Sequence, residues 1–99
     1  MILEHAILDM KPEDQKAYEA ALVQALPLIA ATPGFIKLDV RACVETSGRY
    51  LLLVEWEKLE DHTIGFRQSE RYHQWKELLR RFYSPFPEVE HFGEAIISR

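Results

Sequence analysis

The stretches FIKLDVRACV (35–44), ETSG (45–48) and RYLLLVEWE (49–57) follow one another in mid-chain and decide the fold. In the first stretch, apolar residues alternate with Lys37, Asp39 and Arg41, which is the pattern of a strand with one buried face. The turn that follows is polar and ends in Gly48, and the third stretch is an apolar run of strand length. Together they predict a β-hairpin.

On the N-terminal side of the hairpin, we expect a strand and then a helix. Residues 2–8 form a short apolar run, and Pro12 suits the first turn of a helix, where its missing N–H costs nothing. Pro27 falls inside the apolar stripe of this helix and cannot donate to the Val23 carbonyl, so a kink or a broken last turn is expected there. The stripe consists of Tyr18, Ala21, Leu22, Ala25, Leu28 and Ile29.

On the C-terminal side, the sequence predicts two more helices and a strand. A short helix covers residues 61–66, and Ser69 is a good N-cap for a longer one that follows it. The Ser-Pro-Phe-Pro sequence at 84–87 ends that helix, and residues 89–97 form a last, weaker strand. One face of the longer helix carries Tyr72, Trp75, Leu79 and Phe82.

The order of elements is therefore βαββαβ. This order predicts an α+β fold of the ferredoxin-like class with an antiparallel sheet, in a single domain of residues 1–99. The first and third strands are central in that topology, and they are also the two strands with apolar residues on both faces. Because the helices cover only one face, a second copy of the same sheet is the simplest cover for the other. We expect a homodimer.

Composition excludes several classes of protein. The formal net charge is −4 and the basic residues form only small clusters, which argues against a nucleic-acid partner. No apolar run approaches the roughly 20 residues that cross a membrane, and the N-terminus lacks the features of a signal peptide. The single cysteine, Cys43, cannot build an internal disulfide framework and fits a reducing compartment. We expect a cytoplasmic protein without a membrane partner.

Aromatic and polar side chains are dense between Trp56 and Trp75. Core packing explains each aromatic residue there, but an aromatic-lined pocket for a flat small molecule is the alternative. His62 and Phe66 are four residues apart and share a helix face, so they could form one wall of such a pocket. Tyr72 adds a hydroxyl that needs a hydrogen-bond partner when buried.

No cofactor motif is present. The chain has neither a glycine-rich phosphate loop nor the spacing of a zinc site, although His73 and Glu77 are an i, i+4 pair. His5 and His91 would lie on adjacent strands, and histidine is well matched to removing a proton near neutral pH. We therefore expect no metal and no cofactor.

Several motifs resemble those of a known family, the antibiotic biosynthesis monooxygenase (ABM) domain. They are Pro33-Gly34-Phe35 at the start of a strand, Leu53-Val54-Glu55-Trp56-Glu57 at the end of another, the stretch His62-Thr63-Ile64-Gly65-Phe66-Arg67-Gln68-Ser69-Glu70-Arg71-Tyr72, and the ending of residues 82–91. The resemblance implies a dimeric α+β barrel with a pocket between helices and sheet. It also implies a cofactor-independent monooxygenase, in which a deprotonated phenol itself passes electrons to O₂ and becomes a quinone.

The correspondence of site residues with the family is partial. The monooxygenases place Asn, Trp and Tyr at the spacing of His62, Phe66 and Tyr72, so Tyr72 alone matches. The haem-degrading branch places Asn, Trp and a haem-ligating His near His5, Phe66 and Lys76, and none of these matches. This pattern argues against haem degradation.

The functional prediction is a monooxygenase-type oxidoreductase that acts on a small aromatic or quinone-type metabolite. Isomerisation or breakdown of a small metabolite in the same pocket, and a binding protein without turnover, remain alternatives. The predicted catalytic residues are His62, Tyr72 and His5, and the predicted substrate-binding residues are Phe66, Trp56, Arg67, Trp75 and His91.

Overall fold

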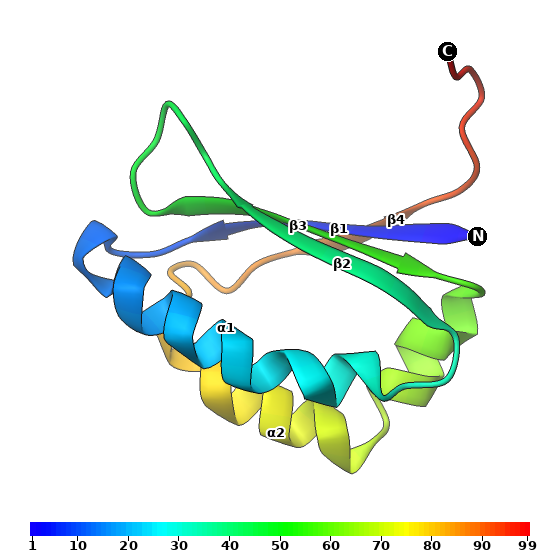
Figure 1. Ribbon diagram of the computed structural model, residues 1–99, viewed down its shortest axis with the longest axis horizontal. Helices are drawn as coiled ribbons and strands as arrows, with labels where there is room; N and C mark the ends of the chain where they lie inside the picture. Colours follow the sequence, from blue (N-terminus) through cyan, green and yellow to red (C-terminus); the bar gives the residue numbers. More distant parts are fainter.

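Four strands form one antiparallel sheet in the computed structural model, which describes residues 1–99. The strand order is β2-β3-β1-β4, so β1 and β3 occupy the centre as predicted (Figure 1). The predicted order of elements and the ferredoxin-like α+β class are confirmed. The strands are β1 (Ile2–Asp9), β2 (Phe35–Ala42), β3 (Arg49–Trp56) and β4 (Val89–Phe92).

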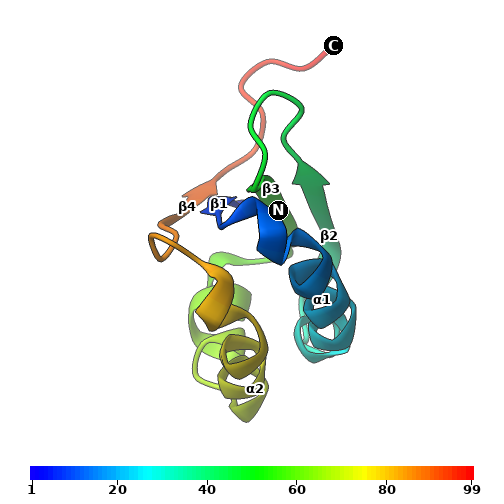
Figure 2. The same ribbon diagram turned by 90° about the vertical axis from the view of Figure 1, so that its left-hand side faces the viewer.

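Two helices lie side by side on the same face of the sheet (Figure 2). They are α1 (Gln15–Ala30), which a 3₁₀ turn η1 (Pro12–Asp14) precedes, and α2 (Glu70–Leu79), which a 3₁₀ turn η3 (Arg80–Phe82) follows. A π-helical turn η2 (Asp61–Phe66) connects β3 to α2. Ser69 caps α2 as predicted, since its hydroxyl accepts from the backbone N–H of Tyr72 at 3.3 Å. None of the helices combines the length and apolar character that a membrane crossing needs.

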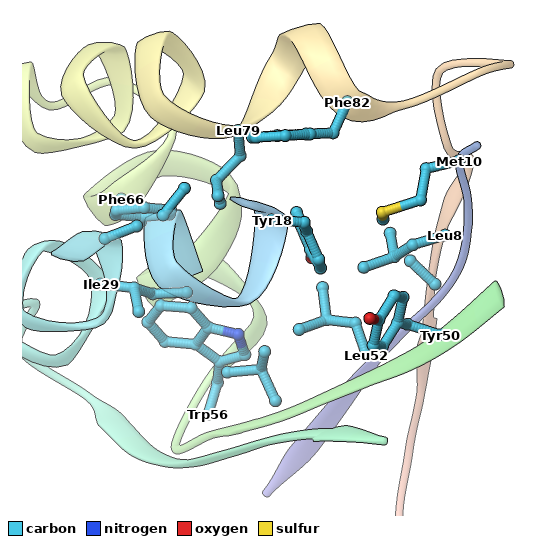
Figure 3. Packing of buried hydrophobic residues seen from close by; sticks show 14 residues of the cluster. Leu8, Met10, Tyr18, Ile29, Tyr50, Leu52, Trp56, Phe66, Leu79 and Phe82 are labelled. Atoms are coloured by element: carbon cyan, nitrogen blue, oxygen red, sulfur yellow. The ribbon is translucent and has the colours of Figure 1, made fainter. Parts of the chain in front are cut away.

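The core lies between the helices and the sheet. Trp56 of β3, Phe66 of η2 and Tyr18 of α1 are its largest fully buried side chains (Figure 3). Burying each such side chain contributes about 1.5–3 kcal/mol to folding. The aromatic packing therefore fixes where η2 and α2 lie over the sheet.

Two strands end at least two residues earlier than the sequence predicts, and α1 is not interrupted where a break was expected. The strand β2 ends at Ala42, not Val44, whose side chain is fully exposed. The strand β4 ends at Phe92 because Phe92 pairs with Leu3 at the beginning of β1, which leaves residues 93–97 with no neighbouring strand. Pro27 does not break α1, which continues to Ala30. Pro27 lies on the solvent side of the helix, where water can satisfy the carbonyl that loses its donor.

The sheet has two faces of different character. Alternate residues of β1 and β3 point toward the helices and are buried. The opposite face, called the outer face from here on, has no covering element within the chain. The hairpin between β2 and β3 and the C-terminal segment both project to this side (Figure 1). The apolar and aromatic side chains of the outer face are Leu3, His5, Ile7, Leu51, Leu53 and Phe92.

Candidate functional site

A cavity of about 90 Å³ lies between the helix-facing side of the sheet, η2 and α2. Ten of its fourteen lining residues are hydrophobic. The sheet supplies Glu4, Ala6, Leu8, Leu52 and Val89, and the helical elements and loops supply Ile29, His62, Phe66, Arg67, Tyr72, Trp75, Tyr83, Phe86 and Pro87. An apolar enclosure with a few convergent polar groups is typical of a site for a small organic molecule.

His62 is the most constrained polar residue of the cavity. It lies in η2 with 3% of its surface exposed, and its ring stacks on Trp56 at a centroid distance of 5.3 Å and an interplanar angle of 17°. Its Nδ1 is hydrogen-bonded to Nε2 of His91 at 2.7 Å, and its Nε2 lies 3.4 Å from Oε1 of Glu4. The π-helical turn directs this side chain inward, and such turns are frequent at functional sites.

Glu4 is a carboxylate buried in the centre of the sheet, with 4% of its surface exposed. The indole Nε1 of Trp56 donates to its Oε1 at 2.9 Å. His91 pairs with Glu4 across the β1–β4 ladder, so the side chains of both residues point toward the helices. Glu4 and His62, both buried, and the partly exposed His91 thus form one polar cluster next to an apolar cavity.

Burial disfavours charge on the groups of this cluster. It raises the pKa of Glu4, and the hydrogen bond from Trp56 and the positive charge of Arg67 only partly oppose this. Burial, then Arg67 and His91, lower the pKa of His62 to about 3, and burial followed by Arg67 lowers that of His91. Because its pKa is lowered to about 3, the His62 ring is neutral near pH 7, so its 3.4 Å approach to Glu4 is not an ion pair. The guanidinium of Arg67, which has no carboxylate partner, supplies the positive charge at the cavity.

An aromatic wall faces the polar cluster. The ring of Phe66 contacts those of Tyr72 and Trp75 edge to face, at centroid distances of 5.4 and 5.8 Å. Tyr83 closes one end, where its hydroxyl lies 3.2 Å from that of Tyr18 and burial raises its pKa to about 12. Flat rings find extensive contact area against such walls.

The structure brings together most of the predicted site residues. His62, Phe66, Arg67, Tyr72 and Trp75 all line the cavity, as the sequence analysis predicted for a shared pocket. His91 does not line it but is hydrogen-bonded to His62. These positions place the residues in one cavity, while their roles remain predictions.

Two predicted residues lie elsewhere. Trp56 is fully buried and does not line the cavity, because its ring is sandwiched in the core and its N–H is bonded to Glu4. His5 lies on the outer face against Phe92, at a centroid distance of 5.7 Å, on the opposite side of the sheet from His62. The expectation that His5 shares a pocket with His62 is wrong. Successive residues of a strand point to opposite faces, and Glu4 takes the position that faces the helices.

Glu4 is the functional candidate that the sequence analysis missed. A signal was present, since Glu4 interrupts the apolar run of β1 and has the same parity as Ala6 and Leu8, both of which are buried. Phe86 and Pro87 were also missed as lining residues, because they lie in a loop whose course the sequence does not specify. No three His, Cys, Asp or Glu side chains gather in an arrangement that could hold a metal ion.

Comparison with known proteins decides the family. The family model described as antibiotic biosynthesis monooxygenase, ABM, matches residues 1–78. The chain belongs to the ABM family. One relative is the uncharacterized protein YczJ of Bacillus subtilis, which is 51% identical in sequence over 95 residues. The alignment covers 96% of this chain and all of YczJ.

Solved structures agree with this family membership. A Bordetella bronchiseptica protein assigned to the antibiotic biosynthesis monooxygenases is 29% identical, with a TM-score of 0.89 over 96% of this chain and 97% of that one. SnoaB of Streptomyces nogalater, a cofactor-independent oxygenase, is 13% identical, with a TM-score of 0.80 over 98% of this chain and 94% of that one. At that identity, the likeness to SnoaB shows the ABM fold and nothing finer.

Proposed function

We propose that this protein is a cofactor-independent monooxygenase that oxidises a small phenolic or quinol-type metabolite in the cavity. The observation that supports the proposal is the buried pair of Glu4 and His62 next to an aromatic wall. Membership of the ABM family points to the same chemistry.

The size of the cavity limits the substrate. At about 90 Å³ it is smaller than the cavity of roughly 150 Å³ that holds benzene in an engineered protein. A single ring already needs more room than this, and the proposal is that Phe86, a lining residue that is 55% exposed, moves aside to admit it. The proposed substrate therefore places a single ring in the cavity.

Removal of the phenolic proton is the first step. Trp56 holds Oε1 of Glu4, and Oε2 has no donor within the protein, so the carboxylate can accept a proton from the ring hydroxyl. Burial moves the pKa of Glu4 upward, toward the range in which a general base works best at neutral pH. The neutral ring of His62 lies next to Glu4, with its Nε2 3.4 Å from Oε1, and its role in the proposal is to position the carboxylate.

Stabilisation of the anion and the reaction with O₂ follow. The unpaired Arg67 stabilises the phenolate, and the aromatic wall excludes water. The phenolate passes electrons to O₂; one oxygen atom forms a new carbonyl on the ring, and the other leaves as water with the displaced ring hydrogen and the phenolic proton. Phenol and O₂ thus balance quinone and water without an external reductant. The proposal assigns to the hydroxyl of Tyr72, a residue of the cavity wall, a hydrogen bond to the oxygen intermediate.

Oxygen uptake with ¹⁸O₂ tests the proposal. Single-ring phenols and single-ring quinols should consume O₂ only when the protein is present. The quinone that forms from a phenol should carry one ¹⁸O atom. Glu4→Gln should lower kcat by roughly 10²–10⁴, the usual contribution of a general base, while Glu13→Gln in η1 serves as the matched control. His62→Ala should also lower kcat, because Glu4 loses the ring that positions it.

Two further variants separate binding from chemistry. Phe66→Ala should raise KM, because it removes wall area, with less effect on kcat. Tyr72→Phe keeps the ring and deletes the hydroxyl, so a loss of kcat assigns the hydroxyl to the reaction. Substrates that bind without any O₂ uptake would contradict the monooxygenase assignment and favour a binding protein.

The proposal includes a homodimer that forms through the outer face. Ile7 and Phe92 are 41% and 48% exposed there, next to the half-buried Leu51 and Leu53 of the central strand β3. Covering these side chains with a second copy removes apolar surface from water.

The proposal also places the protein in the cytoplasm. The free Cys43 fits this placement, because the cytoplasm is a reducing compartment.

A further inference from the structure

Unpaired positive charges gather beside the cavity mouth, although the chain as a whole has a formal charge of −4. Residues 67–81 carry five Lys or Arg side chains and two carboxylates, Glu70 and Glu77. The ion pairs of the chain all lie outside this segment. The positive charges on α2 and its flanks therefore form no ion pair within the protein, and they outnumber the two carboxylates.

Two open grooves continue from the cavity through these charges. The cavity and the first groove, of about 380 Å³, share Tyr83 and Phe86. The first groove and a second one, of about 420 Å³, share Lys76 and Arg80. A molecule that leaves the cavity mouth past Phe86 thus reaches these two cations directly.

Lys76 and Arg80 are four residues apart and extend along one side of the helix where α2 runs into η3. The ammonium of Lys76 lies 5.6 Å from the ring centroid of Tyr72, so it stands directly over the cavity wall. Glu77 and His73 line the far groove with them, and Glu77 forms no ion pair with either cation. The pair can therefore receive an anion from outside.

We infer that the substrate carries a permanently anionic substituent, a carboxylate or a phosphate, which Lys76 and Arg80 bind while its ring occupies the cavity. This inference rests on the proposed function only in taking the cavity as the substrate site. The small volume of the cavity agrees with it, because a ligand larger than one ring must extend into the grooves. The net negative charge of the chain makes this patch the place where an anion is attracted rather than repelled.

Matched ligands test the inference by calorimetry. The probes are 4-propylphenol, which is neutral, 3-(4-hydroxyphenyl)propanoate, and 2-(4-hydroxyphenyl)ethyl phosphate, all at pH 7.5. The wild type should bind the better of the two anionic probes about tenfold more tightly than the neutral one, as expected for two partly exposed charge contacts. The preference should shrink between 50 and 300 mM NaCl, because salt screens exposed charges. The tighter anion identifies the substituent.

The double variant Lys76→Gln/Arg80→Gln should bind all three probes alike, with unchanged affinity for 4-propylphenol. The control Lys16→Gln/Lys58→Gln removes the same charge at exposed positions that line neither the cavity nor the grooves, and should keep the tenfold preference. An undiminished preference in the Lys76/Arg80 variant, or no binding of any probe to the wild type, would overturn the inference. Binding with this preference but without O₂ uptake would refute the monooxygenase proposal alone.

Discussion

The buried histidine of the cluster makes a prediction about stability as a function of pH. His62 is 3% exposed, and burial, Arg67 and His91 lower its pKa to about 3, from an ordinary value of 6.5. In the unfolded chain, the same imidazole takes up a proton below pH 6.5. The native state therefore loses stability as the pH falls from 6.5 toward 3, because in this range the imidazole binds a proton in the unfolded chain but not in the native state.

The magnitude follows from the size of the pKa difference. Each pH unit within this window changes the free energy of unfolding by about 1.4 kcal/mol per group. Between pH 6.5 and pH 5, His62 alone should remove about 2 kcal/mol, a large share of the 5–15 kcal/mol that is typical of a small domain. The lowered pKa of His91 acts in the same direction.

His62→Asn is the perturbation that isolates the effect. Asparagine keeps a polar group near the position of Nδ1 but does not titrate. Urea unfolding, followed by tryptophan fluorescence at a fixed protein concentration, should show the free energy of the wild type falling toward the variant's between pH 8 and pH 5. His73→Asn, which replaces an exposed histidine of α2, should retain the wild-type slope.

Glu4 contributes with the opposite sign. Its raised pKa means that the native state holds a proton that the unfolded chain releases, so its contribution to stability falls as the pH rises above the ordinary value of 4.5. Glu4 is present in all three proteins, and the difference between their curves therefore reports His62. Parallel curves for the wild type and His62→Asn between pH 5 and pH 8 would refute the reasoning from burial.

Two further predictions concern the assembly and the hairpin. The wild type should sediment near twice the 11.6 kDa chain mass. Leu53→Glu, which puts a charge on the outer face, should shift the protein to monomer or unfolded chain. A folded wild-type monomer at micromolar concentration would contradict the dimer. Gly48→Ala should lower the free energy of unfolding by at least about 1–2 kcal/mol, because φ there is +80° and a Cβ would collide with the Met10 carbonyl. Gly93→Ala should leave the free energy of unfolding unchanged, because the space around Gly93 is open. Equal urea midpoints for the two variants would contradict this prediction.

The sequence by itself determined the fold to a large extent. The alternation of β2, the turn at Gly48 and the apolar run of β3 are local patterns, and local patterns set secondary structure. The helix cap at Ser69 and the spacing of His62, Phe66 and Tyr72 depend on chain positions close together, so they too were predicted correctly in place. The central position of β1 followed from its being apolar on both sides.

Only the tertiary structure decided which face of β1 meets the helices. Because both faces of that strand carry apolar residues, the alternation of side chains along it does not tell which face meets the helices, and the sequence left the direction of His5 open. The pairing of Glu4 with His91 and the hydrogen bond from Trp56 selected Glu4 for the cavity and left His5 on the outer face. The reach of the loop that brings Phe86 to the mouth was likewise undetermined, since a loop's course is set by contacts made far along the chain.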